Sequence, residues 1–320
     1  MDVKNKKILF EMSQNSRISL KELAKKVGLN ENTTLYRLKK LEKNEVILGT
    51  HAIIDNTLLG FLGFRVYIKF KGTTAEKEKE ITEWLKKQDE AHVITINTGF
   101  VDCLVISWVK HTIDFHEFIH KFKEHYKDHS EILEISPYVR AHHFNRNYLV
   151  EKGNNKVITI GNEKEVNFDD LDTDILKLLS QNARLSSLEI SKKLQVQSRT
   201  IIERIKKLEK KEIIKGYSIN LNIEKIGYEY HKLNIIFEKN IKYPQLISYS
   251  SNIKNTLFID ETTSKYDYEL NLEVKDYAEL EGIINKIKED FKGIKELQMF
   301  RLKRFEKFVY IPENVKGWII

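Results

Sequence analysis

The sequence SLKELAKKVGLNENTTLYRLKKLEK, residues Ser19–Lys43, decides how this chain is organised. It predicts a helix, a turn at Gly28 and a second helix rich in Lys and Arg. The same pattern returns as SSLEISKKLQVQSRTIIERIKKLEK at Ser186–Lys210. Ile8–Gly49 aligns without a gap to Ile175–Gly216, with 20 identities in 42 positions. The chain therefore contains a duplicated module, and such a repeat is identified before a fold is assigned.

Each copy of the module reads as three helices with defined ends. A serine followed three residues later by a glutamate begins the second helix, and such a pair forms a capping box that satisfies two free backbone N–H groups. The pairs are Ser19 with Glu22 and Ser186 with Glu189. Gly28 gives the first copy the backbone freedom that the turn needs. The second copy has Gln195 there, so its turn has to accommodate a side chain.

The third helix of each copy combines an apolar face with a polar, basic one. Leu35, Leu38 and Leu41 share one face at helical spacing, and we expect that face to be buried. The opposite face can enter a DNA major groove, as the recognition helix of a helix-turn-helix does. The residues expected to bind DNA are Asn32, Thr33, Tyr36, Arg37, Lys40 and Lys43 in the first copy and Arg199, Thr200, Glu203, Arg204, Lys207 and Lys210 in the second.

These residues divide into two kinds of DNA contact. The basic side chains near the helix ends suit phosphates, which set affinity and register rather than sequence preference. The candidates for base edges are Asn32, Thr33 and Tyr36 in the first copy and Arg199, Thr200 and Glu203 in the second. Two such helices held about 34 Å apart would address successive major grooves on one face of B-DNA.

The excess positive charge of the chain lies in the two modules. The net charge is +7, to which residues 1–49 contribute +5, residues 169–216 contribute +3 and the remainder −1. This distribution is expected if the modules bind a polyanion and the other segments do not. The alternative is a solvated, lysine-rich face on an ordinary three-helix unit.

After each module the pattern changes to strands, beginning with the short β-like runs Val46–Ile54 and Ile213–Leu221. The following segments have the order strand, helix, strand, strand, helix, strand, which is the ferredoxin-like split βαβ order. In the first copy they are Phe64–Phe70, Thr74–Gln88, Val93–Thr98, Cys103–Val109, Ile113–Tyr126 and Ile132–Ala141. In the second copy they are Tyr230–Phe237, Tyr243–Ser250, Thr256–Thr262, Tyr266–Val274, Tyr277–Phe291 and Ile294–Arg304.

The predicted fold class is therefore α+β, with two copies of a (winged) helix-turn-helix followed by a ferredoxin-like βαββαβ domain. Residues 1–55 and 169–222 form the two helix-turn-helix domains. Residues 60–148 and 227–312 form the two βαββαβ domains. Residues 149–168 form a linker with a short strand at Val157–Ile160.

The composition fits folded domains in a reducing compartment. Hydrophobic residues make up 41% of the chain and only 3 residues are proline. No apolar run approaches the roughly 18–20 residues that span a bilayer, and the N-terminus has no signal-peptide pattern. Cys103 is the single cysteine, which excludes an intrachain disulfide framework. We expect a cytoplasmic protein without a membrane partner.

Four stretches carry a resemblance to a known family. Two lie in the modules, ILFEMSQNSRISLKELAKKVGLNENTTLYRLKKLE at 8–42 and ILKLLSQNARLSSLEISKKLQVQSRTIIERIKKLE at 175–209. The others are TGFVD at Thr98–Asp102 and TSKYD at Thr263–Asp267, at the central turn of each βαββαβ unit. With these motifs the chain resembles the Lrp/AsnC (feast/famine) family of prokaryotic transcription regulators, in the tandem form of archaeal members.

The resemblance implies a division of labour between the domains. The modules would bind double-stranded DNA, and the βαββαβ (RAM) domains would pair through their sheets and bind a small effector, often an amino acid. The effector-binding residues that it implies are Thr98, Gly99, Asp102, Thr263, Ser264 and Asp267. Family members are homo-oligomers built from dimers, so one chain with two copies could supply an intrachain pseudo-dimer.

The chain departs from the family pattern at several positions. Glu45 and Glu212 replace the glycine that precedes the strand closing each module, and Ser264 replaces a glycine of the effector turn. Glu203 places a carboxylate on the DNA-facing side of the second copy, where the first copy has Tyr36. We therefore expect the first copy to bind DNA more strongly, or the two copies to prefer different half-sites.

The sequence favours a sequence-specific transcription regulator over an enzyme, with no catalytic residues, metal or cofactor. Nucleoid or architectural DNA binding is one alternative. Sirohaem decarboxylases that resemble this family are another, but Ile94–Asp102 lacks their His-Asn-Tyr-type motif. HEFIH at 116–120 matches the H-E-x-x-H zinc-protease pattern. Because the apolar stripe of that helix lies on the other side, we expect His116 and His120 to face solvent.

Overall fold

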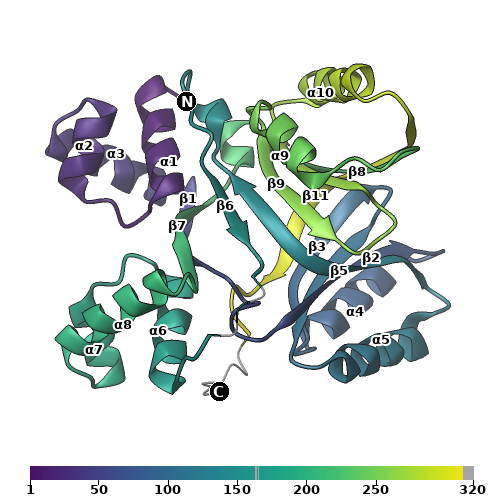
Figure 1. Ribbon diagram of the computed structural model, residues 1–320, viewed down its shortest axis with the longest axis horizontal. Helices are drawn as coiled ribbons and strands as arrows, with labels where there is room; N and C mark the ends of the chain where they lie inside the picture. The colour runs from purple at the N-terminus through teal and green to yellow at the C-terminus, as the bar shows by residue number, and fades with distance from the viewer. Residues whose placement is uncertain (163, 165, 313–320) are drawn as a thin grey trace.

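The computed structural model describes residues 1–162, 164 and 166–312 of the chain. Two three-helix modules lie next to each other at one end of the molecule, on the left in Figure 1. A barrel of strands with helices on its outside forms the other end (Figure 1). The helical and strand-rich halves predicted for each copy are thus separated in space, and like halves of the two copies lie together.

Both modules contain the three predicted helices and a closing strand. The first module consists of α1 (Val3–Gln14), α2 (Leu20–Val27), α3 (Glu31–Lys43) and β1 (Ile47–Ile54). The second consists of α6 (Asp170–Gln181), α7 (Ser187–Leu194), α8 (Ser198–Lys210) and β7 (Ile214–Leu221). Strands β1 and β7 pair antiparallel in a two-stranded sheet, so the closing strand of each module lies against that of the other.

The remaining elements follow the predicted βαββαβ order twice. The first copy has β2 (Leu62–Phe70), α4 (Ala75–Lys86), β3 (Ala91–Gly99), β4 (Cys103–Val109), α5 (Thr112–Tyr126) and β5 (Ser130–Phe144). The second copy has β8 (Glu229–Phe237), α9 (Tyr243–Ser251), β9 (Thr256–Thr262), β10 (Tyr268–Val274), α10 (Tyr277–Asp290) and β11 (Ile294–Phe308). The connections contain η1 (Asn147–Leu149), β6 (Val157–Ile160) and η2 (Glu224–Ile226).

The two βαββαβ units do not form separate sheets. The strand order is β2-β4-β3-β11-β8-β10-β9-β5-β6, and an additional pairing of β2 with β5 closes the first eight strands into a barrel-like sheet. Strands β5 and β11, each 15 residues long, make this closure possible. Residues 130–137 of β5 pair with β2 and residues 138–143 with β9. In the same way, β11 pairs with β8 over 294–301 and with β3 over 300–308.

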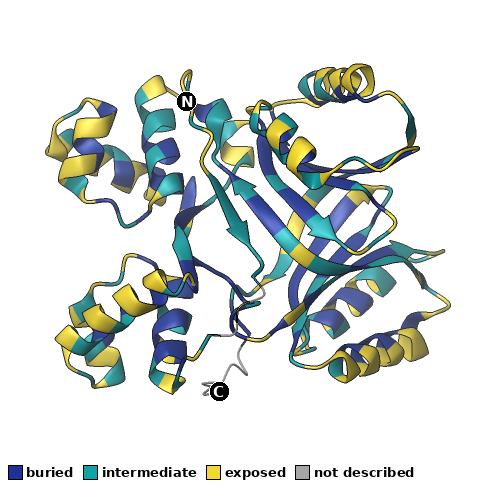
Figure 2. Cartoon of the chain, in the orientation of Figure 1, coloured by how far each residue is buried: buried dark blue, intermediate teal, exposed yellow. Residues whose placement is uncertain are grey.

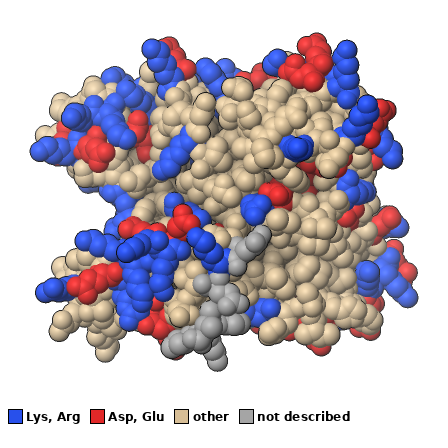
Figure 3. Space-filling model, viewed as in Figure 1, with Lys and Arg blue, Asp and Glu red and all other residues tan. Residues whose placement is uncertain are grey.

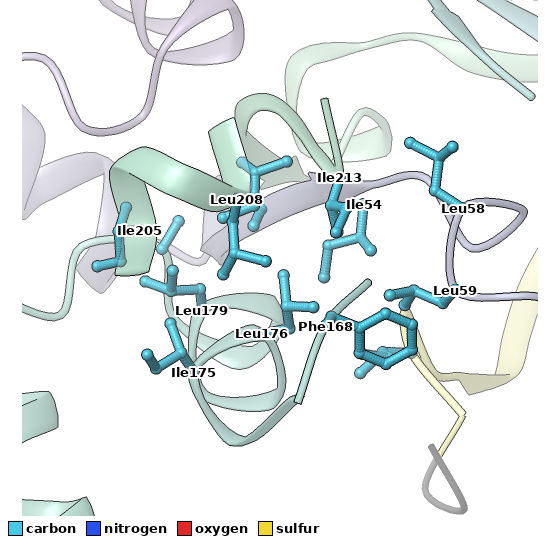
Figure 4. Close-up of a cluster of buried hydrophobic side chains, with 14 of the residues drawn as sticks. Ile54, Leu58, Leu59, Phe168, Ile175, Leu176, Leu179, Ile205, Leu208 and Ile213 are labelled. Carbon is cyan, nitrogen blue, oxygen red and sulfur yellow. The ribbon is translucent and has the colours of Figure 1, made fainter. Parts of the chain in front are cut away.

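Each module completes its hydrophobic core with residues of the other copy. In the second module, Leu176 and Leu179 of α6 pack in one cluster with Ile54 and Leu59, which belong to the first copy (Figure 4). In the first module, Ile219 of β7 is part of the core. Figure 2 shows the helices buried on their inner faces and exposed on their outer faces. Burial of apolar side chains therefore stabilises the association of the two copies as well as each module.

The turns inside the modules follow the sequence, with one exception. Gly28 adopts a left-handed conformation with φ of 70°, and Gln195 takes the same conformation with φ of 55°, as the second copy requires. Ser186 and Glu189 form the complete capping box. The exception is the first copy, where Ser19 accepts the N–H of Glu22 but the Glu22 carboxylate does not accept the N–H of Ser19, so the predicted capping box is only half formed.

Helix α5 buries the expected apolar stripe, and its histidine motif faces outward. Phe115, Phe118 and Phe122 are among its buried residues, whereas His116 and His120 lie on the exposed side. Cys103 is buried on β4, and burial raises the pKa of its thiol to about 12. The described part of the chain contains no group of three or more His, Cys, Asp or Glu arranged to hold a metal ion.

The two glutamates that replace glycine carry backbone strain. Glu45 and Glu212 have φ of 54° and 61°, a region that costs an L-residue about 1–2 kcal/mol. We predict that Glu212→Gly raises the free energy of unfolding by roughly 0.5–1 kcal/mol, because relief of strain exceeds the chain entropy that glycine adds. Thermal or denaturant unfolding measures the change. Glu212→Ala is the control, since it keeps the Cβ, and an equal gain in both variants would contradict the explanation.

Candidate nucleic-acid interface

The third helix of each module buries one face at positions i, i+4 and i+7. The buried residues are Thr34, Leu38 and Leu41 in α3 and Ile201, Ile205 and Leu208 in α8. The expectation that Leu35 belongs to this face is wrong, because 36% of the residue is exposed. Thr34 occupies the buried position instead, and its hydroxyl donates to the Asn30 carbonyl at 2.9 Å. A threonine that satisfies its own polar atom can thus replace a leucine in the core.

The residues predicted to bind DNA gather on the outward side of α3 and α8. Those exposed are Asn32, Tyr36, Lys40 and Lys43 in the first module and Arg199, Glu203, Lys207 and Lys210 in the second. Thr33 and Thr200 are half-buried, and 66% of Tyr36 is exposed. The fold therefore brings each set to one surface of its module, and contact with DNA stays a prediction for each residue.

Arg37 and Arg204 have a structural role that the sequence did not reveal. Nη1 of Arg37 lies 2.6 Å from Oδ2 of Asp2, the N-cap residue of α1. This hydrogen bond lowers the pKa of the Asp2 carboxyl. In the second module, Arg204 makes the same contact with Asp169, the N-cap of α6, at 2.5 Å. Both arginines thus tie the third helix to the first and keep part of their charge engaged within the module.

The two candidate recognition surfaces differ in chemistry. On α8, Arg199 and Glu203 form an exposed ion pair with Nε and Oε1 at 3.1 Å. The matching residues on α3 are Asn32 and Tyr36, a neutral amide and an aromatic ring. An exposed ion pair contributes little to stability, so the side chains remain available to other partners. The second module offers mixed charge where the first offers neutral hydrogen-bonding and aromatic groups.

A residue of the second copy supports the end of helix α3. Lys225 in η2 lies 2.7 Å from the Glu45 carboxylate and donates to the Asn44 carbonyl at 3.0 Å. Beside it, a hollow of about 480 Å³ opens along α3, lined among others by Thr33, Tyr36, Lys40 and Lys225 itself. Part of the surface around the first recognition helix therefore comes from the other copy.

Reciprocal arginine contacts fix the two modules against each other. Nη1 of Arg17 donates to the carbonyl of Ala183 at 2.6 Å, and Nη1 of Arg184 donates to the carbonyl of Ser16 at 2.8 Å. The backbone N–H of Ser16 also donates to the carbonyl of Tyr217 on β7. Arg17 and Arg184 are equivalent positions of the repeat, and their identity in both copies was the sequence signal that could have indicated this contact.

The charge distribution agrees with the position of the helices. Figure 3 shows Lys and Arg side chains gathered over both modules, with acidic residues among them. The lysines of α3 and α8, and Arg199, are exposed along the helices rather than buried in ion pairs with the barrel, whereas Arg37 and Arg204 are half-buried. Such a surface attracts a polyanion over a distance of about a Debye length.

The residues implied as an effector site lie at two turns of the barrel. The Asp102 carboxylate accepts the N–H of Phe70 at 2.9 Å, and Asp267 accepts the N–H of Phe237 at 2.8 Å. Both aspartates therefore fasten the central turn to the first strand of their unit. Thr98 and Thr263 are exposed. The hydroxyl of Ser264 lies 3.0 Å from that of Thr262.

The turn of the first copy borders a pocket of about 470 Å³. It is lined by Lys69, Gly99, Phe100, Leu133, Leu297, Gln298 and Met299. Of the six residues that the family resemblance implies as an effector site, Gly99 is the one that contributes to the lining of this pocket. A Cβ at Gly99 would lie 2.7 Å from the carbonyl oxygen of Met299, so only glycine fits this close approach of the turn to β11. The lining from β11 could not be seen in the sequence, since β11 belongs to the other copy.

Comparisons with known proteins agree with this geometry. The family model of winged helix-turn-helix DNA-binding domains matches residues 1–47 and 168–215, which are the two modules. An HTH-type transcriptional regulator of Pyrococcus furiosus is 34% identical over 142 residues, which cover 39% of this chain and 96% of that protein. That relative is less than half as long as the present chain, as expected if the chain contains two copies.

Solved structures show likeness at two levels. The sirohaem decarboxylase NirDL matches 97% of this chain and 94% of its own, at 14% identity and a TM-score of 0.61, which shows a shared fold. The structure of E. coli AsnC matches 43% of this chain and 93% of its own, at 22% identity and a TM-score of 0.39. With the repeated motifs and the two matched modules, the chain belongs to the Lrp/AsnC family of HTH-type transcriptional regulators. It is a DNA-binding transcription regulator.

No helix among the described residues is long and apolar enough to cross a membrane.

The arginine contacts between the modules predict how the protein tolerates DNA geometry. We expect Arg17→Ala combined with Arg184→Ala to lower affinity for the preferred site by roughly tenfold and to broaden the range of half-site spacings that bind. The reason is that the recognition helices, then held only by the β1–β7 pairing and the shared cores, favour one separation less strongly. Binding to duplexes whose spacing changes in single base-pair steps measures the effect. An unchanged spacing profile would show that the arginines do not set the separation.

Proposed function

We propose that the two recognition helices of one chain read two unlike half-sites on a single DNA duplex. The observation that supports this most strongly is that equivalent positions of α3 and α8 are exposed but carry side chains of different chemistry. The two modules that contain these helices are held together by reciprocal arginine contacts. A homodimer presents the same helix twice and favours a palindrome. A chain with two different helices favours a bipartite site without that symmetry.

The residues at the outward face fit distinct roles in the proposed complex. Asn32 can pair with an adenine edge and Arg199 with a guanine edge, as these side chains commonly do. Leu35 and Ile202, with 36% and 42% exposed, lie on the same helices and suit apolar contact with thymine methyl groups. Sequence reasoning missed these two residues because it placed Leu35 in the core.

The lysines toward the C-terminal ends of α3 and α8 are proposed to contact phosphates. We predict that Lys40→Ala with Lys43→Ala weakens binding to all sequences and lowers the slope of log affinity against log salt by about 2, because each lost phosphate contact removes roughly 0.9. Lys207→Ala with Lys210→Ala should have a similar effect on the slope. Titrations of a bound duplex at several salt concentrations measure both.

The matched control is Lys121→Ala with Lys123→Ala, which removes two exposed lysines from α5 on the barrel. Its salt slope should equal that of the unaltered protein. If the α3 and α5 variants lose the same amount of salt slope, the basic charge acts at long range and α3 does not contact the phosphates.

Selection from fragmented genomic DNA then separates a sequence-specific regulator from an architectural protein, since only the regulator enriches a shared motif.

We further propose that a small amphipathic effector such as an amino acid binds in the pocket at Gly99. Its volume of about 470 Å³ lies in the usual range for small-ligand sites. Leu133, Leu297 and Met299 supply an apolar wall, and the ammonium of Lys69 lies at its edge, beside Asp102 at 3.0 Å. An amino acid has a carboxylate that can pair with the Lys69 ammonium and a side chain that can pack against the apolar wall.

Filling the pocket should abolish this binding. We predict that at least one amino acid raises the melting temperature of the unaltered protein, and that Leu133→Trp removes this shift because the indole occupies the pocket. Ile113→Trp, at an exposed position of α5, is the control for the added indole and should keep the shift. No response of the unaltered protein to any of the twenty amino acids would contradict the proposal.

The pseudo-dimer within one chain is proposed as the unit that binds DNA, and further association of chains is compatible with it. The likeness to a sirohaem decarboxylase is a likeness of fold and assigns no activity to this chain. Titration of the purified protein with sirohaem would detect such an activity by a change in the absorbance of the tetrapyrrole. We expect no change.

A further inference from the structure

The interior of the barrel contains a buried cluster of charges from both copies. Arg65 on β2 lies 2.6 Å from Asp260 on β9, and Lys232 on β8 lies 2.8 Å from Asp260 and 2.7 Å from Glu269 on β10. The hydroxyl of Tyr67 on β2 donates to Glu269 at 2.5 Å. None of the four charged side chains is more than 8% exposed. The ion pairs are therefore shielded from water, and an unmatched charge there is costly.

The internal repeat identifies the equivalent positions in the two copies. Asp102 and Asp267 anchor the comparison, because each accepts the N–H of the last residue of its first strand. In addition, Thr95 faces Leu104 across β3 and β4, as Asp260 faces Glu269 across β9 and β10. The equivalent residues are Arg65 and Lys232, Thr95 and Asp260, and Leu104 and Glu269.

The acidic members of the cluster thus occur in only one copy. Both copies contribute a base, Arg65 or Lys232, whereas both acids come from the second copy. Burial raises the pKa of Asp260, but the charges of Arg65 and Lys232 outweigh burial and hold it at about 2. The Asp260 carboxyl is therefore ionised at neutral pH, and the cluster pairs two basic side chains with two acidic ones.

A pair of like copies could not reach this balance. Two first copies would bring two Arg65 side chains into the interior with Thr95 and Leu104 in place of the acids. Two second copies would bring two Lys232 side chains and four carboxylates. Only the unlike pair is neutral. Removing the partner of a buried charge is strongly destabilising, and a charge left unpaired is an effective means of excluding a wrong partner.

The contacts between the two helical modules do not discriminate in this way. Arg17 and Arg184 donate to equivalent backbone carbonyls, and β1 pairs with β7 through backbone groups, so like copies could form the same contacts. A second charged pair does discriminate. Arg146, after β5, lies 2.8 Å from Glu273 on β10, where the first copy has Trp108.

We infer that the charged interior of the barrel makes the sheet face of the first copy fit the second copy and reject another first copy. The partner of each half is the unlike half, of the same chain or of a second copy of this chain. The symmetric contacts stabilise the association of any two halves, and the charge cluster selects which two associate. This inference does not depend on what the modules bind.

The test uses the whole chain with a protease-cleavage sequence inserted between β6 and α6. The folded protein is cleaved, unfolded in guanidinium and refolded, and the pairs are counted by native mass spectrometry. Random association gives roughly half unlike pairs. We expect unlike pairs to exceed like pairs by about 100-fold or more, as loss of buried ion pairs requires. A near-random distribution would overturn the inference.

Uncut chains give a second test that needs no reassociation. The acid-free variant (Asp260→Asn with Glu269→Gln) leaves two bases unpaired and should unfold at a much lower temperature. A fourfold variant that adds Arg65→Met and Lys232→Met has no charge in the cluster and should recover most of the loss. In the cleaved form, it should pair nearly at random. If the fourfold variant is no more stable than the acid-free variant, charge balance is not what the interior requires.

Discussion

Two long strands hold this molecule together. Strands β5 and β11 each begin in the sheet of their own copy and end in the sheet of the other, which closes eight strands into one barrel. Their backbone hydrogen bonds cross the boundary between the copies. The pairing of β1 with β7 and the shared hydrophobic cores of the modules also join the two copies. The pocket beside Gly99 depends on that exchange, because residues of β11 line it.

The duplication has allowed the two copies to diverge at positions that face each other. In the charge cluster of the barrel interior, both acids belong to the second copy, so the two sheet faces are complementary rather than identical. On the modules, an ion pair on α8 faces solvent where α3 presents Asn32 and Tyr36. The charge cluster inside the barrel determines which halves associate. The outward faces of α3 and α8 give the associated halves different surfaces. Both differences support recognition of a DNA site without two-fold symmetry.

Local patterns made much of the fold predictable from sequence. The repeat, the capping serines and the βαββαβ order placed nearly every helix and strand, because periodicity and caps act within a few residues. Leu35 was wrongly predicted in the core, where Thr34 lies instead, since a threonine with a satisfied hydroxyl is polar by its residue type alone. The closed barrel, the Arg37–Asp2 pair and the charge cluster depend on contacts between distant segments, which no local pattern specifies. The glutamates at positive φ were visible only as departures from a family glycine.

In the proposed complex, one chain presents two unlike recognition helices to one duplex. The most direct measurement is the mass of the complex formed on a duplex with a single selected site, combined with a footprint of that site. We predict one chain per duplex and protection of both half-sites by that chain. Two chains per duplex, each protecting one half-site through the same module, would contradict it.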